Sequence, residues 1–267
     1  MKPALAALML LCLTAGGCGG STASLRYAYP QGRVTTYRWT MDATTTPSGG
    51  PRRTLHLETV VRERVMGRLG GGGGRLEAVL EPGEALQDGR HVNPGPGLTL
   101  DLDVGPDGHV TRVGATSSLP AGAVGSLGLD RLLVESRPPL PARSVRLRDR
   151  WKADVTTPVP AAPGASPSSG GGSAIHLAGT GRLERFLLRD GRRIAAMTIQ
   201  RRGRVAMRPG GSTATSTATG MATDTTAAEF DLDRGLVIGA TSKALTNVTF
   251  ASGPVQVELT TRVKLGG

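Results

Sequence analysis

The chain has 267 residues, 39 of them glycine, and a formal net charge of +11, whereas aromatic side chains make up only 3% of it. This length suffices for one large domain or two smaller ones, whose core must rest on Leu, Val, Ile and Ala. The positive charge favours anionic surfaces such as lipid headgroups or envelope polymers, and the scarcity of aromatic residues argues against a protein that stacks nucleic-acid bases.

The first twenty residues have the layout of an export signal. Lys2 is followed by an uncharged apolar run at residues 4–14, by small residues at 15–17, and then by Cys18. A membrane-spanning helix needs roughly twenty apolar residues, so this run is too short to be one. We therefore expect residues 1–17 to be a signal peptide.

Cys18 resembles the lipidated cysteine of bacterial lipoproteins, because Thr14-Ala15-Gly16-Gly17 before it match the residue types of a lipobox. The resemblance implies that Cys18 is acylated and opens the mature chain, with residues 18–24 as a tether. Cys12 would be removed with the signal, so Cys18 would be the only cysteine left and lipidation would explain it. We expect an exported protein anchored by its acyl chains to the bacterial cell membrane or outer membrane. The alternative is a secreted protein in which Cys18 is a free thiol.

The rest of the chain is typical of an antiparallel β protein, since alternating segments rich in β-branched residues are separated by glycine-rich breaks. Asp-Gly pairs at 107–108 and 190–191 predict hairpin turns. Only residues 119–136 lack strand character, and residues 129–134 predict a short central helix. The expected strands are 25–29, 34–45, 53–67, 75–86, 98–104, 109–115, 145–155, 173–188, 192–207, 219–233, 236–250 and 255–265. We expect a mainly β fold built from curved antiparallel sheets.

The order of signals favours an internal duplication, with a first β half at residues 25–136 and a second at 137–267. Trp39 lies early in the first half and Trp151 early in the second. Chance similarity between hairpins is the alternative. Together with the lipobox, this organisation resembles uncharacterised bacterial lipoproteins with a duplicated all-β body and, more loosely, half-barrel lipoproteins that carry lipids or acylated proteins across the envelope.

Catalytic and metal chemistry has little support in the sequence. Gly-x-Ser-x-Gly, Ser-x-x-Lys, His-Glu-x-x-His and P-loop lysine motifs are missing, which argues against common hydrolases and nucleotide-binding proteins. Two aspartate pairs and four histidines are candidate acid–base or metal groups, but strands entering turns and scattered surface histidines explain them better. They are Asp101 with Asp103, Asp231 with Asp233, and His56, His91, His109 and His176. We expect no catalytic residue, cofactor or metal ion.

Arginines cluster around one predicted hairpin. Clustered guanidinium groups suit phosphate or carboxylate recognition through their planar fork. A solvated arginine-rich face is the first interpretation and contact with an anionic lipid or envelope polymer the second. Nucleic acid is a remote third for an exported protein. The cluster comprises Arg182, Arg185, Arg189, Arg192, Arg193, Arg201, Arg202 and Arg204.

Two functions therefore stand side by side. The first is a binding or carrier lipoprotein, in which curved sheets hold a lipid or acyl chain in an apolar groove. The second is a structural or interaction lipoprotein that binds an envelope partner through its sheet edges or its basic face. An enzyme is the third choice.

Overall fold

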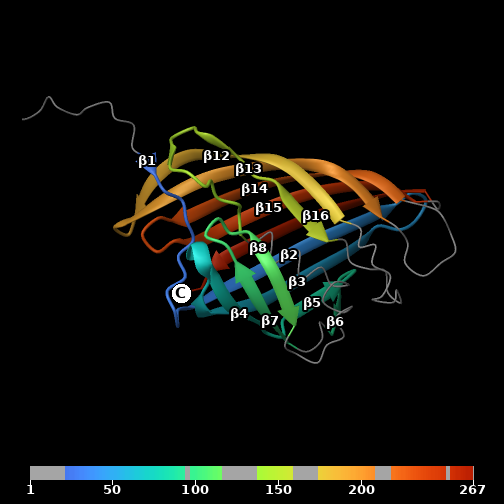
Figure 1. Ribbon diagram of the computed structural model, residues 1–267. Coiled ribbons are helices and arrows are strands. Elements are labelled where there is room, and N and C mark those ends of the chain that lie inside the picture. Colours follow the sequence, from blue (N-terminus) through green and yellow to red (C-terminus); the bar gives the residue numbers. More distant parts are fainter. Residues whose placement is uncertain are drawn as a thin grey trace, which may run out of the picture.

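The computed structural model describes residues 22–93, 97–115, 137–158, 174–207, 218–250 and 253–266. Within these ranges the regular structure is almost entirely antiparallel β-sheet (Figure 1). The mainly β fold with a curved antiparallel sheet is thus confirmed. The expected signal peptide, Cys18 and the expected helix at 129–134 lie outside the described residues.

One sheet of 14 strands contains most of the described chain, and β1 and β9 form a separate pair. The main path runs β10-β12-β13-β14-β15-β16-β2-β3-β4-β7-β8, with β11 paired to β12 and β5 paired to both β3 and β6. The first strands are β1 (Thr22–Ala23), β2 (Val34–Pro47), β3 (Arg53–Arg68), β4 (Gly74–Leu80), β5 (Glu84–Gln87), β6 (Arg90–Val92), β7 (Leu98–Val104) and β8 (Val110–Ala115), with a 3-10 turn, η1 (Gly70–Gly72), between β3 and β4. The others are β9 (Val145–Arg146), β10 (Arg150–Lys152), β11 (Val155–Pro158), β12 (Ala174–Arg189), β13 (Arg192–Met207), β14 (Ala218–Asp231), β15 (Leu236–Phe250) and β16 (Gly253–Leu265).

The predicted hairpin turns are confirmed. Asp190 and Gly191 have φ of 51° and 73° and join β12 to β13, which is the backbone that a two-residue hairpin requires. Gly108, with φ of 85°, lies in the turn between β7 and β8. Local turn chemistry therefore fixes where these long strands reverse.

Residues 25–29 do not form the expected strand. Leu25, Tyr27 and Tyr29 are buried and the residues between them are exposed, so the alternation is real. The alternation does not come from strand pairing, however, because the segment crosses the end of the sheet as extended chain without pairing along a ladder. Alternating burial indicates an extended backbone packed on one side, and pairing does not follow from it.

Two other expected strands are divided. The segment 75–86 breaks at Pro82-Gly83 into β4 and β5, where Glu81 N still donates to Val60 O at 2.9 Å. The segment 145–155 becomes β9, β10 and the start of β11. β6 was not predicted. Proline and glycine interrupt pairing even where the hydrophobic pattern continues.

The two expected halves share one sheet. β16 at the end of the chain pairs with β2 near its start, from Val255 opposite Pro47 to Leu265 opposite Tyr37. Trp39 lies in the middle of this sheet on β2, whereas Trp151 lies on the short edge strand β10. The duplication stays a prediction.

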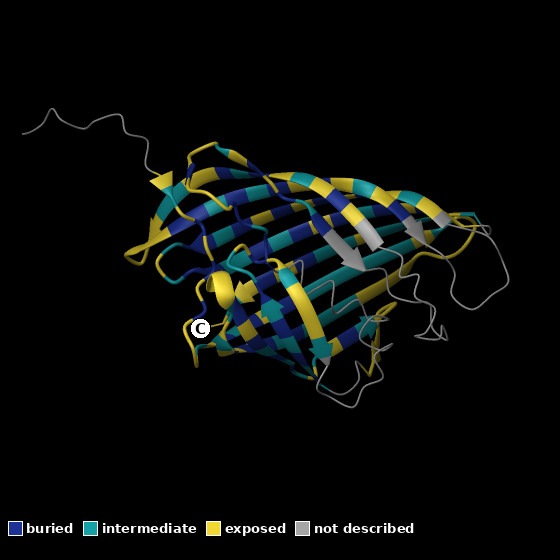
Figure 2. Cartoon of the chain, viewed as in Figure 1, coloured by how far each residue is buried: buried dark blue, intermediate teal, exposed yellow. Residues whose placement is uncertain are grey.

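The main core fills the curl of the sheet. Figure 1 shows the long strands β12–β15 arching over the short strands β4, β7 and β8. Side chains from both sides meet there, including Leu76 and Leu102 from below and Met197 and Phe230 from above. Figure 2 shows the buried positions gathering where the long strands face β4, β7 and β8, while exposed and half-buried positions alternate along the far ends of the long strands. A smaller cluster at that far end contains Val155, Leu177, Val205, Ala222 and Val248.

Candidate binding site

The concave side of the sheet, which carries the main core, is called the inner face. Along the long strands its side chains form rows, because directly paired residues point to the same side of a sheet. Leu55, Ala43 and Leu259 form one row across β3, β2 and β16, and Leu57 lies beside Met41 in the next row. Leu55 is exposed, at 37%, and the other four positions are half-buried. We call Met41, Ala43, Leu55, Leu57, Val257 and Leu259 the apolar strip.

Two unused polar atoms lie beside the apolar strip. Thr261 pairs directly with Met41, and Trp39 precedes Met41 by two residues on the same side of β2. Both residues are buried, and neither Trp39 Nε1 nor Thr261 Oγ1 has a hydrogen-bond partner within the described chain. An unmade buried hydrogen bond costs roughly 1–3 kcal/mol. Both atoms are enclosed by protein, so a ligand on the strip reaches them only if the surrounding side chains move.

A buried charged group lies further along the inner face. Arg201 and Asp224 are directly paired on β13 and β14, and Arg201 Nε donates to Asp224 Oδ2 at 2.7 Å. Ser242 Oγ donates to the other carboxylate oxygen at 2.6 Å. Arg201 lies over Gly179, where an added Cβ would come within 2.4 Å of Arg201 Cγ. The glycine leaves space for the arginine to lie flat against β12.

Tyr27, Tyr29 and Tyr37 close the end of the inner face that carries the main core. Tyr27 stacks near Tyr29 with ring centroids 6.3 Å apart and meets Phe230 edge to face at 5.3 Å. Their hydroxyls donate to Pro138 O and Gly105 O, each at 3.2 Å. The chain segment that failed to form a strand therefore serves as a tightly packed cover over this end.

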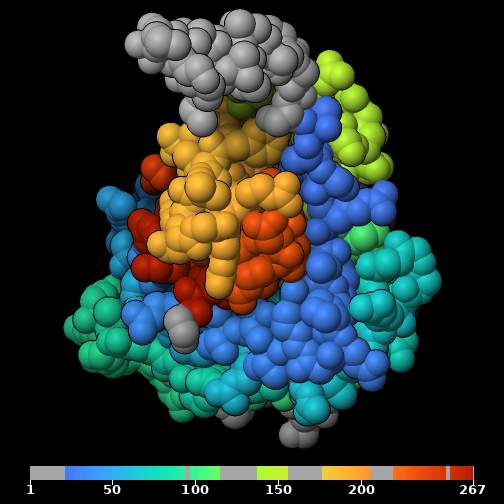
Figure 3. Space-filling view, turned by 90° about the vertical axis from the view of Figure 1, so that its left-hand side faces the viewer, coloured from blue at the N-terminus to red at the C-terminus, as the bar shows by residue number. Residues whose placement is uncertain are grey.

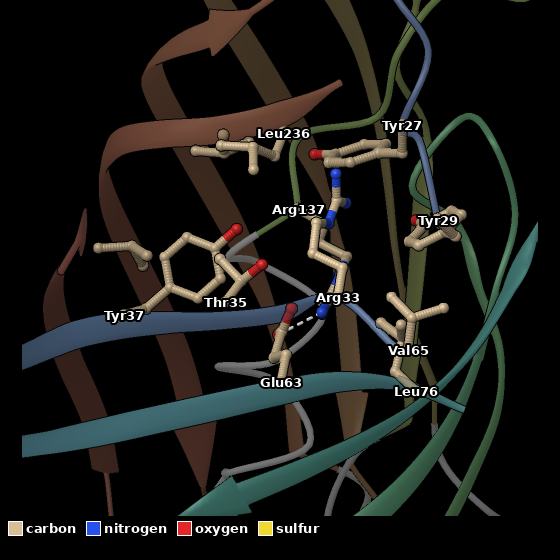
Figure 4. Close-up of a pocket in the computed structure, with 12 residues that line it drawn as sticks. Tyr27, Tyr29, Arg33, Thr35, Tyr37, Glu63, Val65, Leu76, Arg137 and Leu236 are labelled. Atoms are coloured by element: carbon tan, nitrogen blue, oxygen red, sulfur yellow. Dashed lines mark hydrogen bonds and ion pairs between the residues drawn. The ribbon is translucent and has the colours of Figure 1, made fainter. Parts of the chain in front are cut away.

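Behind the tyrosines, Arg137 forms a buried ion pair with Glu63 of β3, and Figure 4 shows both among Tyr27, Tyr29 and Tyr37. Burial raises the pKa of each tyrosine well above its usual value. Burial, the largest single influence, would by itself lower the pKa of Arg137, but the interactions with Glu63 and with the three tyrosines together outweigh burial and raise the net pKa. The Arg137 guanidinium therefore stays charged inside the fold.

The cavity at this end is small. It has a volume of about 30 Å³ and is lined by the tyrosines, Arg33, Thr35 and the ion pair. Since a water molecule needs on the order of 10–15 Å³ measured in this way, the space suits a water molecule or two and excludes an acyl chain.

The arginines of the predicted basic cluster do not share one surface. Arg201 faces inward and is buried, whereas the hairpin arginines are paired with acids at the end of β14 and in the following turn. These pairs are Arg189 with Glu229, Arg192 with Asp231, and Arg193 with Asp233, while Arg182 lies 3.7 Å from Glu184. Arg185, Arg202 and Arg204 are exposed and have no ion-pair partner among the described residues. Only these three fit the idea of a free basic face.

The acidic pairs and histidines occupy separate structural positions. Asp103 contacts Arg75 and Arg112, and Asp231 Oδ1 accepts the backbone N–H groups of the turn that follows it. His56 lies 2.7 Å from Asp42, and His91 lies in the same row two strands away, because Leu86 pairs with both histidines. Within the described ranges, His, Cys, Asp and Glu form no group that could hold a metal ion.

Sequence reasoning missed the groups that build the closed end. Arg137 and Glu63 lie 74 positions apart, and neither belonged to a motif. One signal was available: Glu63 interrupts the apolar alternation of Thr59, Val61 and Val65 on the core side of β3. A charge at a core position requires a buried partner, although its identity depends on the fold.

The chain matches no protein-family model and no curated protein. Among the described residues, no helix is long and apolar enough to cross a membrane.

Proposed function

We propose that this protein is an exported binding protein, anchored through acylated Cys18, that holds a lipid acyl chain against the apolar strip. The observation that carries the proposal is the continuity of half-exposed apolar side chains across three paired strands on the concave side of the sheet. Exposed apolar patches on soluble proteins commonly mark ligand or partner sites. Trp39 Nε1 and Thr261 Oγ1 lie buried beside the strip without partners in the described chain, and a shift of the side chains that cover them would let the polar group of an amphiphile bind there.

The test uses two matched substitutions. Leu55→Glu places a charge on the apolar strip, whereas Met221→Glu places one on the opposite face, at a residue of similar exposure, 38% against 37%. With a fluorescent fatty acid as probe, the wild-type protein should bind it, Leu55→Glu should weaken binding at least tenfold, and Met221→Glu should change it less than twofold. Absence of probe binding by the wild type, or equal loss in the two variants, overturns the proposal.

The anchor has its own measurement. Mass spectrometry of the protein extracted from its own membranes should detect an acylated chain beginning at Cys18, and Cys18→Ser should remove that added mass and release the protein from the membrane. A mature chain with an unmodified cysteine would overturn the anchor while leaving the proposal for the apolar strip standing.

A second candidate is contact with an anionic envelope polymer through Arg185, Arg202 and Arg204. It is supported by their exposure on β12 and β13 without a carboxylate partner in the described chain. Crosslinking in intact cells should then recover a partner that is lost when these three arginines are changed to Gln. Recovery of the same partners from the variant would exclude this face as the contact.

A further inference from the structure

A cleft of about 540 Å³ opens at the end of the sheet, outside the apolar strip. Its walls come from three places far apart in the sequence: residues 28–33, the connection from β3 to β4, and the turn between β14 and β15. Figure 3 shows the blue N-terminal segment lying between the orange β14–β15 region and the teal residues that follow β3. Ligand sites typically have volumes of roughly 300–1,000 Å³, so the cleft is large enough for a small organic molecule.

The charges that line the cleft are strongly one-sided. Arg33, Arg68 and Arg234 line it together with a single acid, Asp233. That acid is already engaged, because Asp233 Oδ1 accepts from Arg193 Nη2 at 2.7 Å and Oδ2 accepts from the Arg193 backbone N–H at 3.0 Å. None of the three lining arginines has an ion-pair partner among the described residues. The cleft therefore holds three positive charges and one carboxylate that is already bound by Arg193.

Arg33 is held in place by the fold. Its Nη1 donates to Arg234 O at 2.9 Å and its Nη2 to Ala28 O, while its buried Nε has no partner in the described chain. Its backbone carbonyl accepts from Val65 N at 2.9 Å, and the preceding Gly32 N donates to Val65 O at 2.9 Å. Burial, with a contribution from Arg234, lowers the pKa of Arg33. An arginine bonded only to carbonyl oxygens keeps its charge available to an anion.

The turn that carries Arg234 is also fixed. Ala28 N donates to Gly235 O at 2.9 Å, and an added Cβ at Gly235, whose φ is +63°, would lie 2.6 Å from Ala28 Cβ. The turn and the N-terminal segment therefore touch closely, so the Arg33 guanidinium and the backbone that carries Arg234 are positioned before any ligand arrives. Such preorganisation reduces the entropy lost on binding.

From this geometry we propose that the cleft lined by Arg33, Arg68 and Arg234 binds the phosphate group of a phosphate ester. Guanidinium forks match the oxygens of phosphate. The volume of the cleft leaves room for the organic part of the ester, with Tyr29 and Pro30 as an apolar wall. The site shares no residue with the apolar strip and does not depend on acyl-chain binding.

The phosphate can belong to a soluble ester or to a lipid headgroup. In a protein anchored at Cys18, ten residues separate the anchor from Ala28, a span of at most about 36 Å, so the cleft lies within reach of headgroups. The experiment therefore has two arms: calorimetric titration with glycerol phosphate, and sedimentation with vesicles of phosphatidylglycerol or of phosphatidylcholine.

The variant Arg68→Gln with Arg234→Gln removes two charges from the cleft and leaves Arg33, which has structural hydrogen bonds, intact. Its control is Arg53→Gln with Arg90→Gln, which removes two exposed arginines that have no described ion-pair partner and do not line the cleft. We expect the first variant to lose at least tenfold in affinity and the control less than twofold. The effect should decrease as salt rises, because exposed charges are screened.

Each outcome decides the question. Binding of glycerol phosphate that is lost only in the cleft variant supports a soluble ester as ligand, and the same pattern with phosphatidylglycerol vesicles alone supports a headgroup. Equal loss in both variants means non-specific attraction by net charge and overturns the proposal, as does the absence of binding in both arms by the wild type. The fatty-acid assay with Leu55→Glu is unaffected by these results, so the two proposals fail separately.

Discussion

The ion pair between Arg137 and Glu63 gives the sharpest test of how this fold is stabilised. Their side chains are only 6% and 11% exposed, so removing one partner leaves the other charge in a place with little water. Breaking a buried pair in this way costs roughly 3–5 kcal/mol, whereas replacing both partners by apolar side chains is often neutral or stabilising. Arg137→Met or Glu63→Leu alone should therefore lose about 3–5 kcal/mol, and the double variant should regain most of it.

Urea unfolding followed by circular dichroism measures the three variants against the wild type. The control is the pair Arg62–Glu81, which starts from the adjacent residue of β3 but is 58% and 39% exposed. Its coupling should be about 1 kcal/mol or less. If a single variant is too unstable to fold while the double variant folds, that result also supports the reasoning. Single losses below about 1 kcal/mol, or a double variant as unstable as the sum of the singles, would refute the reasoning.

Two further predictions concern the same closed end. All three tyrosines of the chain, Tyr27, Tyr29 and Tyr37, have raised pKa values in the fold. Stability from this source is complete below the unfolded value of about 10 and is lost as pH rises towards the raised values. An alkaline titration should thus show tyrosinate absorbance appearing together with unfolding, and ionisation of the tyrosines in a still folded protein would contradict the burial. Gly74→Ala should cost about 1–3 kcal/mol because its Cβ would lie 2.4 Å from Tyr29 Cγ, while Gly67→Ala, with no atom within 4 Å, should change the free energy of unfolding by less than about 0.5 kcal/mol. Equal midpoints for the two glycine variants in thermal unfolding would show that Tyr29 has room to move.

Strand positions were predictable where local chemistry decided them. β7, β13 and β15 have the predicted bounds, because β-branched alternation and turn residues act over only a few positions. Pairing was harder to predict, and residues 25–29 illustrate why: their alternation is the same as that of a strand, but their neighbours in space are Pro106 and Gly235. Sequence periodicity reports which side of a segment is buried, and it carries no information about the partner.

For the candidate sites too, the sequence indicated residues but not which of them lie together in the fold. The arginine cluster was visible in the sequence, yet the fold turned Arg201 inward to Asp224 and paired three hairpin arginines with acids about 40 residues away. The sequence does not indicate the arginines of the cleft, because Arg33 and Arg234 are 201 positions apart and are joined only by a hydrogen bond across the fold.

The sequence by itself determined the class of fold, the bounds of several long strands and the Asp-Gly turns, since these depend on side-chain alternation and on backbone preferences of neighbouring residues. It also carries the prediction of a lipidated Cys18. Only the tertiary structure decided that β16 pairs with β2, that an ion pair and three tyrosines close one end, and that three arginines surround one cleft. These features depend on contacts between residues far apart in the chain, whose free energy is realised only when the whole sheet has formed.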